Sequence, residues 1–333
     1  MIWLAWRQHR VQFLVALLCF AAVAAVMVVT GLRMRHAFAD AGLPSCLPKV
    51  TGAEIGVTAP PPGTQGDYTV ANCVGLARQL SDRYETVTGV LAILFTMLPL
   101  FVGLFFGAPL VAREVEQGTH RLVWTQGITR RRWALVKFGL VGAVTLALAG
   151  AFAALSTWWI DPLARATGRG FNYLFFDQRG IVPAAYTLFA VALGTAAGAL
   201  WRKGLPAMAA TLVTFLVVRV GIAALARPRF LPARRITELI TEPRELNRLH
   251  GDWIVSMGVH RADGTLLVGD GQVGCPPGEG RCLREFGAGA YNQWLVQPVG
   301  RFWTFQWIET GIYVALAALL LWYAVHRVRR RIS

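Results

Sequence analysis

Six long apolar runs constrain the fold of this 333-residue chain more than any other feature of its sequence. A helix needs ~20 apolar residues to cross the hydrocarbon core of a bilayer, and each run is long enough. Inside lipid a helix also satisfies its own backbone hydrogen bonds. The runs therefore predict an all-α polytopic membrane protein with six transmembrane helices. We place these spans at 11–32, 87–112, 133–160, 181–200, 205–226 and 305–326.

Composition and charge agree with a membrane protein. Only 15% of the residues are charged, whereas soluble domains average ~25%. The chain has 33 Lys+Arg against 18 Asp+Glu, a formal charge of +15. In a soluble protein this excess would suggest nucleic acid. Here much of it lies at span ends, where membrane orientation and anionic headgroups account for it. We expect contact with membrane lipid and no nucleic-acid partner.

The positions of the basic residues predict the orientation of the spans. Lys and Arg gather in the loop 113–132, the turn 201–204 and the tail 327–333. Basic loops stay on the cytoplasmic side, so these segments are predicted to lie inside the cell. The segments 33–86 and 161–180 are then outer loops. The prediction is a multi-pass cell-membrane protein with both termini in the cytoplasm.

The first ten residues, MIWLAWRQHR, combine Trp3 and Trp6 with Arg7 and Arg10. Tryptophan favours the headgroup level and arginine extends its charge toward water. Residues 1–10 are thus predicted to form an interfacial amphipathic helix. A cleaved signal peptide is the alternative. However, the apolar run that follows exceeds the 7–15 residues of a signal-peptide core, and no persuasive cleavage site ends it.

The longest polar segment, 227–304, is predicted to form an extracellular subdomain of mixed α/β structure between the fifth and sixth spans. Its beginning, 233–250, has helical character. Residues 254–273 alternate between apolar and polar and contain Asp263-Gly264, a hairpin turn signal.

Four of the five cysteines fall in segments predicted to lie outside, where disulfides persist. They are Cys46, Cys73, Cys275 and Cys282. Four cysteines allow three connectivities. The local pairs Cys46–Cys73 and Cys275–Cys282 need the least rearrangement, and four free thiols are the alternative. Cys19 lies in the first span, where we interpret it as a small apolar residue.

The loop between the second and third spans carries the most specific pattern in the chain. Residues 113–137 read REVEQGTHRLVWTQGITRRRWALVK. An acidic pair, Glu114 and Glu116, is followed by the Gly118-Thr119 step. Leu122, Thr125, Gln126 and the Thr129-Arg130 pair come next. A basic loop between spans would account for the arginines but not for this order.

This order resembles the cytoplasmic loop between the second and third spans of ABC type-2 (ABC-2) exporter permeases. The close match covers about 25 residues, and the layout of spans agrees over the whole chain. Gly127 departs from the pattern, because many members have proline there. In the family this loop forms a coupling helix that docks on the ATPase subunit.

The resemblance implies a function, partners and a set of coupling residues. The chain would be the permease subunit of an ABC exporter, paired with a second permease copy or paralogue. ATP would bind to a separate ATPase subunit, and this chain would bind no cofactor. Weakly charged spans favour a hydrophobic or amphiphilic substrate. The coupling residues would be Arg113, Glu114, Glu116, Gly118, Thr119, Arg121, Arg130, Arg131 and Arg132.

The sequence shows no pattern for catalysis. It contains no G-x-x-x-x-G-K-[ST] for phosphate binding, no H-E-x-x-H and no G-x-S-x-G. The six histidines are scattered without a second ligand nearby, so no metal site is predicted. We therefore expect a transport subunit that is not itself an enzyme. A membrane-embedded sensor or scaffold, with a ligand-binding ectodomain and no transport, is the alternative function.

Two charges stand out well inside the predicted spans. Arg219 lies in the fifth span and Glu309 in the sixth. Charges at such depth are costly unless they are paired or hydrated. Each could reach the outer headgroups separately. The sharper hypothesis is an Arg219–Glu309 pair that ties the two spans together and closes an outer gate.

Overall fold

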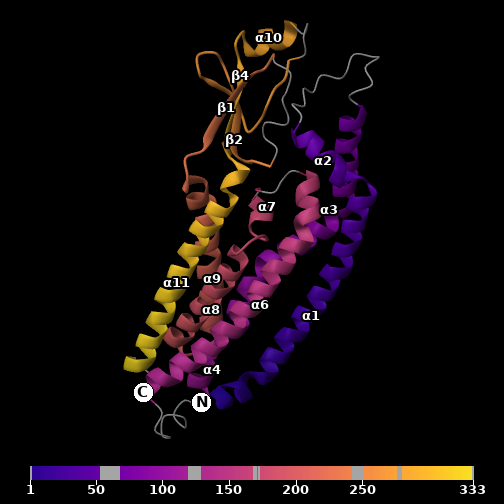
Figure 1. Ribbon diagram of the computed structural model, residues 1–333. Coiled ribbons are helices and arrows are strands. Elements are labelled where there is room, and N and C mark those ends of the chain that lie inside the picture. The colour runs from indigo at the N-terminus through magenta and orange to yellow at the C-terminus, as the bar shows by residue number, and fades with distance from the viewer. Residues whose placement is uncertain are drawn as a thin grey trace.

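The structure is a computed structural model that describes residues 2–52, 68–118, 129–167, 171, 173–241, 251–275 and 280–331. Within these residues, six helical segments are long and apolar enough to cross a membrane. A four-stranded sheet stands at one end of the helices, and the N and C marks lie at the other (Figure 1). We call these the sheet end and the termini end.

The helices follow the order of the apolar runs. The first is α1 (Ile2–Asp40), followed by the short α2 (Leu43–Gly52). The second segment comprises α3 (Tyr68–Val102), the π-helical turn η1 (Gly103–Gly107) and α4 (Pro109–Glu116). The third is α6 (Arg130–Thr167), followed by α7 (Tyr173–Phe176). The fourth is α8 (Val182–Trp201). The fifth comprises α9 (Gly204–Gly221), η2 (Ile222–Ala226) and η3 (Arg227–Arg229). The sixth is α11 (Phe302–Arg331), which follows the turn η5 (Val299–Arg301).

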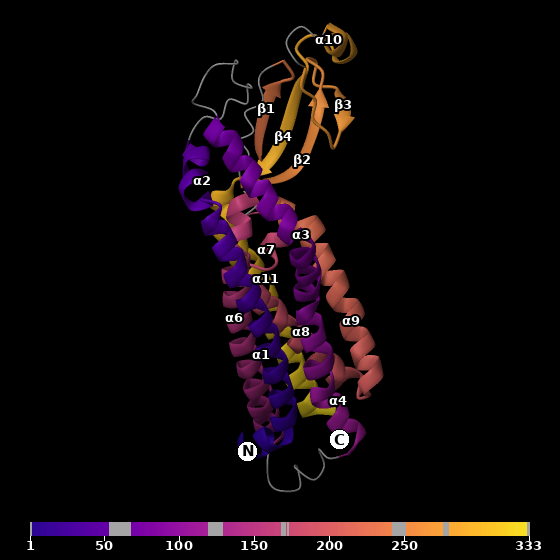
Figure 2. The same cartoon turned by 90° about the vertical axis from the view of Figure 1, so that its right-hand side faces the viewer.

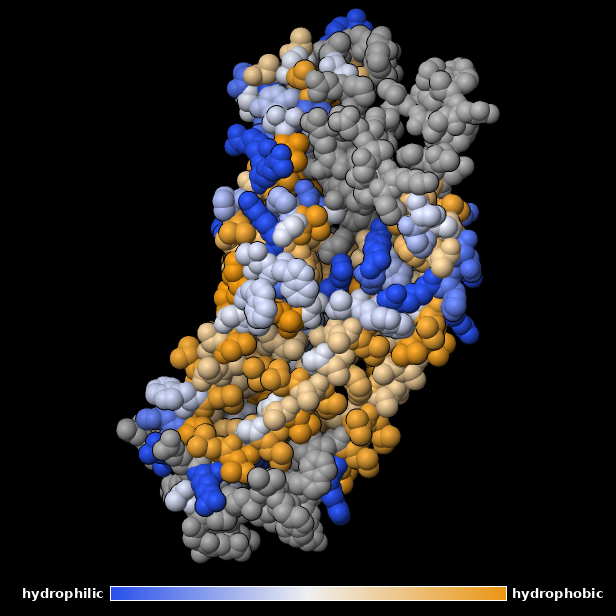
Figure 3. Space-filling model, viewed as in Figure 1, coloured by the Kyte–Doolittle hydropathy of each residue, from blue (hydrophilic) through white to orange (hydrophobic). Residues whose placement is uncertain are grey.

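Helix α8 forms the centre of the bundle. In its most apolar window 78% of the residues are buried, against 33% or less in the other five spans. It packs against α11, α9, α6, η1, α4 and α3. The other spans leave many large apolar side chains exposed, such as Val90 and Leu205. These side chains form an apolar band between more hydrophilic ends (Figure 3). Lipid can solvate this band, so the chain is a multi-pass membrane protein.

Glycines bring α8 into backbone contact with the second segment. A Cβ atom at Gly194 would lie 2.5 Å from the Gly103 oxygen and 2.6 Å from the Ala108 nitrogen. At Gly198 a Cβ would lie 2.5 Å from the Ala108 oxygen. No side chain fits at either position. The GxxxG spacing in α8 is therefore a close helix contact, as small residues permit in membranes.

The helices extend beyond the predicted spans. Residues 2–10, predicted as a separate interfacial helix, continue without a break into the first span. The described residues of the predicted loop 33–86 are mostly helical, since α3 begins 87 − 68 = 19 residues before the predicted second span and α2 precedes it. Apolar residues in α3 recur at helical spacing and pack on α2. This small core contains Leu43, Leu47, Cys73, Ala77 and Leu80. The predicted loop 161–180 likewise contains the end of α6 and all of α7.

The polar segment before α11 forms an antiparallel sheet of order β1-β4-β2-β3. The strands are β1 (Arg234–Leu239), β2 (Trp253–His260), β3 (Leu266–Gly269) and β4 (Tyr291–Gln297), with α10 (Gly280–Phe286) before β4. Figure 2 shows the four strands beyond the end of α9. The predicted hairpin turn at Asp263-Gly264 is confirmed between β2 and β3. Gly264 has φ +87°, and Thr265 donates two hydrogen bonds to Asp263.

The helical prediction for 233–250 is wrong at its start, because residues 234–239 form strand β1. The physical reason is pairing. β1 lies along β4 over six residue pairs, from Arg234 with Val296 to Leu239 with Tyr291. Edge pairing of this kind depends on a distant strand and overrides local helix propensity. Residues 242–250 lie outside the described residues.

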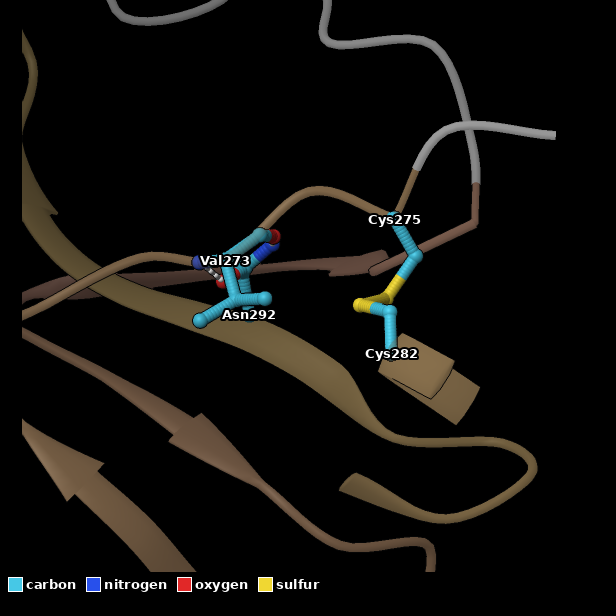
Figure 4. The surroundings of a disulfide bond; sticks show 4 residues. All are labelled: Val273, Cys275, Cys282 and Asn292. Carbon is cyan, nitrogen blue, oxygen red and sulfur yellow. Dashed lines mark hydrogen bonds between the residues drawn. A yellow bond between two sulfur atoms is a disulfide. The ribbon is translucent and has the colours of Figure 1, made fainter. Parts of the chain in front are cut away.

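Both local disulfide pairings are present. Cys46–Cys73 joins α2 to α3 across a sequence separation of 27. On the chain-entropy model, closing such a loop stabilises the fold by ~3 kcal/mol. Cys275–Cys282 lies beside the sheet, where Asn292 exchanges two hydrogen bonds with the Val273 backbone (Figure 4).

The glycine contact generates a prediction. We expect Gly194→Ala to lower the thermal stability of the purified protein markedly, because the new methyl group would meet backbone atoms that cannot rotate away. Overpacking of this kind typically costs ~1–3 kcal/mol. Gly142→Ala in α6 is the control, since a Cβ there meets no atom within 4 Å. Equal stability of the two variants would contradict the backbone contact.

Candidate functional site

Four charged side chains and one tyrosine meet inside the bundle near the sheet end. The turn before α8 supplies Asp177, α8 supplies Tyr186, α9 supplies Arg219, η3 supplies Arg227 and α11 supplies Glu309. The most exposed of them, Arg219, is only 7% exposed. We call these five residues the ion cluster. Three membrane spans and a connecting turn thus contribute to one buried polar site.

Arg227 connects the two carboxylates of the cluster. Its Nε lies 2.7 Å from Glu309 Oε2, and its Nη2 lies 2.8 Å from Glu309 Oε1. The same Nη2 lies 2.7 Å from Asp177 Oδ1. This two-pronged contact with Glu309 uses the guanidinium geometry that favours arginine for carboxylate pairs. Arg227 is 1% exposed and Glu309 is fully buried.

Arg219 and Tyr186 complete the cluster. Arg219 Nη2 lies 2.5 Å from Asp177 Oδ2, and its Nη1 lies 3.5 Å from Glu309 Oε1. The Arg219 guanidinium carbon lies 3.6 Å from the centre of the Tyr186 ring, a cation–π contact. The Tyr186 hydroxyl donates to Glu309 Oε1 at 2.5 Å. Two carboxylates therefore face two guanidinium groups, and the formal charges cancel.

The structure brings Arg219 and Glu309 together, as the paired hypothesis requires, but as part of a larger set. Asp177 and Arg227 make the shorter contacts, and both were assigned to outer segments. One signal could have found Arg227. It follows Arg219 by 227 − 219 = 8 residues, and on a continuous α-helix this spacing would put the two side chains within about a quarter turn of each other.

A glutamine on α11 positions the start of α8 next to the cluster. Gln306 Oε1 accepts hydrogen bonds from the Ile181 and Val182 nitrogens, both at 3.0 Å. Its Nε2 donates to the Phe176 oxygen at 3.1 Å. These nitrogens belong to a helix N-terminus, which would otherwise be unsatisfied in the interior. Gln306 thereby links α11 to the start of α8 and to the turn containing Asp177.

The predicted coupling residues that the structure describes lie at the termini end (Figure 1). Glu114 is buried and pairs with Lys137 of α6, so its side chain faces the bundle. Glu116 is exposed, and its Oε2 accepts a hydrogen bond from the Gly204 nitrogen at 3.2 Å. Gly118 has φ +68°, a conformation that favours glycine. Arg113 and Arg132 are exposed.

The remaining predicted coupling positions are not described in full. Thr119 and Arg121 lie outside the described residues, and of Arg130 and Arg131 only the backbone is described. Across the described ranges, no group of three His, Cys, Asp or Glu side chains could hold a metal ion.

The buried cluster and the six spans define a multi-pass membrane protein with polar groups inside its bundle near the sheet end. The profile of the family described as "ABC-2 membrane transporter related" matches residues 17–227. The chain therefore belongs to this family of ABC-2-type permeases, which are membrane transport components. Membership implies association with an ABC ATPase subunit. No curated protein matches the chain, and no solved structure does.

The cluster predicts energetic coupling between its members. Glu309→Gln and Arg227→Gln should each destabilise the protein by ~3–5 kcal/mol, because each leaves an opposite charge buried without its partner. The double variant should cost clearly less than the sum of the two single changes. Arg219→Gln with Glu309→Gln should couple more weakly, since that contact is 3.5 Å. Equilibrium unfolding in mixed micelles measures these free energies.

The control is the pair Asp161–Arg165, whose contact is 2.9 Å but whose arginine side chain is 67% exposed. A pair one helical turn apart at this exposure should couple by ~0.5 kcal/mol or less. Strict additivity for Arg227 and Glu309, within the same error, would contradict the cluster as one interacting unit.

Proposed function

We propose that this chain is the transmembrane subunit of an ABC exporter for a hydrophobic or amphiphilic substrate. A separate ATPase subunit would bind the loop 113–132 from the cytoplasm. The family membership and the absence of a phosphate-binding motif from the sequence support this division of labour. The basic residues of the loop 113–132, the turn 201–204 and the tail 327–333 support an orientation with the termini end in the cytoplasm and the sheet outside.

The observation that carries the proposal is how α4 is attached to the bundle. Glu114 pairs with Lys137 of α6, and Glu116 binds the backbone at the start of α9. Immediately before α4, the second segment contacts α8 through Gly194 and Gly198. A force applied to the loop after α4 would therefore act on α6, α8 and α9 together. Such direct attachment is what a docking loop needs in order to transmit ATP-driven movement.

The ion cluster suits an outer gate. It joins α8, α9, α11 and the turn containing Asp177 near the sheet end. Its formal charge is balanced while it is closed, and opening it would require water to reach the separated charges. In the exporter, a second permease copy or paralogue would complete a twelve-span pathway. The exposed apolar faces of the outer spans leave room for such a partner or for lipid.

A sensor or scaffold is the second candidate, and the sheet is the observation that favours it. The sheet has its own small core, formed by Ile240, Val259, Cys275 and Ala290. It is also tied by its own disulfide. Co-purification separates the two candidates. A transport subunit should bring down an ABC ATPase in stoichiometric amounts, whereas a sensor should not.

The coupling assignment predicts the effect of two substitutions. Glu116→Arg replaces the acceptor for the Gly204 nitrogen with a side chain that can only donate hydrogen bonds, and Gly118→Val forces a β-branched residue to φ +68°. Both proteins should reach the membrane. Each should lose transport about fivefold or more, the equivalent of one lost hydrogen bond for Glu116→Arg and of a strained backbone for Gly118→Val. Each should also lose substrate-stimulated ATP hydrolysis by the partner.

Gln117→Arg is the matched control, because it adds the same cation at an exposed position between the two. It should behave as the unmodified protein does. Normal transport with full ATPase stimulation in both Glu116→Arg and Gly118→Val would show that this loop does not couple the two subunits.

A further inference from the structure

A cavity of about 260 Å³ lies between α1, the second segment, α6 and α8. An apolar cavity of ~150 Å³ is enough to hold a benzene molecule, so this one has room for a larger ligand. Most of its wall is apolar, with aromatic side chains from three spans. They include Phe20 of α1, Phe95 and Phe105 of the second segment, and Phe152 of α6.

One end of the cavity is polar. Asp177, Gln178, Tyr186 and Arg219 line it there, so the cavity reaches the ion cluster. The Gln178 side chain is 2% exposed, and neither its Oε1 nor its Nε2 has a hydrogen-bond partner within the described part of the chain. The same holds for Arg219 Nε. Buried polar atoms are normally satisfied, so these groups beside the cavity are available to hydrogen-bond a ligand bound there.

The electrostatics restrict the head group of that ligand. The two carboxylates and two guanidinium groups of the cluster already balance one another. A charged head group would add an uncompensated charge in a water-poor site, which is costly. The Gln178 amide both donates and accepts hydrogen bonds, and Arg219 Nε donates one. The matching head group is uncharged and carries hydroxyl or amide groups.

We propose that this cavity binds a single-chain amphiphile with an uncharged, hydrogen-bonding head group, of the monoacylglycerol type. The head contacts Gln178 and Arg219, and the acyl chain lies along the aromatic wall between α1 and α6. Binding at this site is a property of this chain alone. That the amphiphile is also the transported substrate rests on the proposed function.

The first experiment compares four twelve-carbon ligands on the purified full-length chain in nanodiscs, without an ATPase. These are 1-monolauroylglycerol, laurate, dodecyltrimethylammonium and dodecane. Equilibrium binding of 1-monolauroylglycerol should be at least about tenfold tighter than that of the other three, as expected for one desolvated hydrogen-bonding group. Tighter binding of laurate or of the cation would overturn the uncharged head group. Equal binding of dodecane would overturn the polar end of the site.

Gln178→Leu tests the polar contact without changing volume much. It should weaken binding of 1-monolauroylglycerol about tenfold and leave dodecane binding unchanged. Because it replaces a buried amide whose atoms have no partner in the described residues, it should not lower the melting temperature. Unchanged binding of 1-monolauroylglycerol in this variant would overturn the assignment of Gln178.

Ala149→Phe tests the cavity itself, since Ala149 lines it and the larger ring would occupy it. This variant should lose binding of 1-monolauroylglycerol. Ala147→Phe is the control, because Ala147 is an exposed residue of the same helix. Retained binding in the folded Ala149→Phe protein would place the ligand elsewhere.

If that variant does not fold, the alkylation rate of Cys19, which also lines the cavity, tests whether the ligand occupies the cavity. In the unmodified protein 1-monolauroylglycerol should slow alkylation by N-ethylmaleimide several-fold, and no slowing would overturn the proposal.

These measurements separate the site from the proposed function. Binding with the expected selectivity, together with no ATP-dependent movement of 1-monolauroylglycerol in the complex with an ATPase, would support the site and remove it from the transport pathway. Absence of binding in the isolated chain would overturn the site while leaving the exporter assignment intact.

Discussion

The ion cluster is the interaction on which the upper half of this protein depends. Arg227 bridges Asp177 and Glu309, and Arg219 closes the set from α9. Each charge is stable in the interior only because the others are present, since an unpaired buried charge costs several kcal/mol. The cluster therefore does not tolerate small displacements of a single helix. It makes α8, α9 and α11 one unit near the sheet end.

The second constraint is a close helix contact further along α8, at two glycines that have no side chain to separate the backbones. Gly194 and Gly198 meet the backbone of the second segment, just before α4 and the coupling loop. Helix α8 is 20 residues long, so it spans ~30 Å between the cluster and the termini end. One rigid helix thus connects the proposed gate to the segment on which an ATPase would act. Coupling by a packed, continuous element needs no long chain of side-chain contacts.

The sequence predicted six apolar helices because the length of an apolar run is a direct physical requirement of a bilayer. Arg219 and Glu309 were noticed because charges are rare inside such runs. Asp177 and Arg227 were missed because they lie just past the run ends, where charges are ordinary. The burial of Glu114 against Lys137 was also missed, because it depends on a contact between two helices 23 residues apart. Local patterns identify elements, whereas partners across the bundle come only from packing.

The position of the cavity relative to these two constraints has a mechanical consequence. Asp177, Tyr186 and Arg219 on one side belong to the unit held by the ion cluster, while α1, α3 and α6 form the other side. The glycine contact joins the two sides nearer the termini end. A movement that separated the sides near the cluster would leave the ion pairs and the glycine contact intact, but it would break the hydrogen bonds from Ser156 to the Gln178 oxygen and from the Gly180 nitrogen to Thr157. Such a movement changes the cavity volume without exposing an unpaired charge. A ligand between the two sides would therefore bind the two arrangements with different affinity, and no ion pair would have to break.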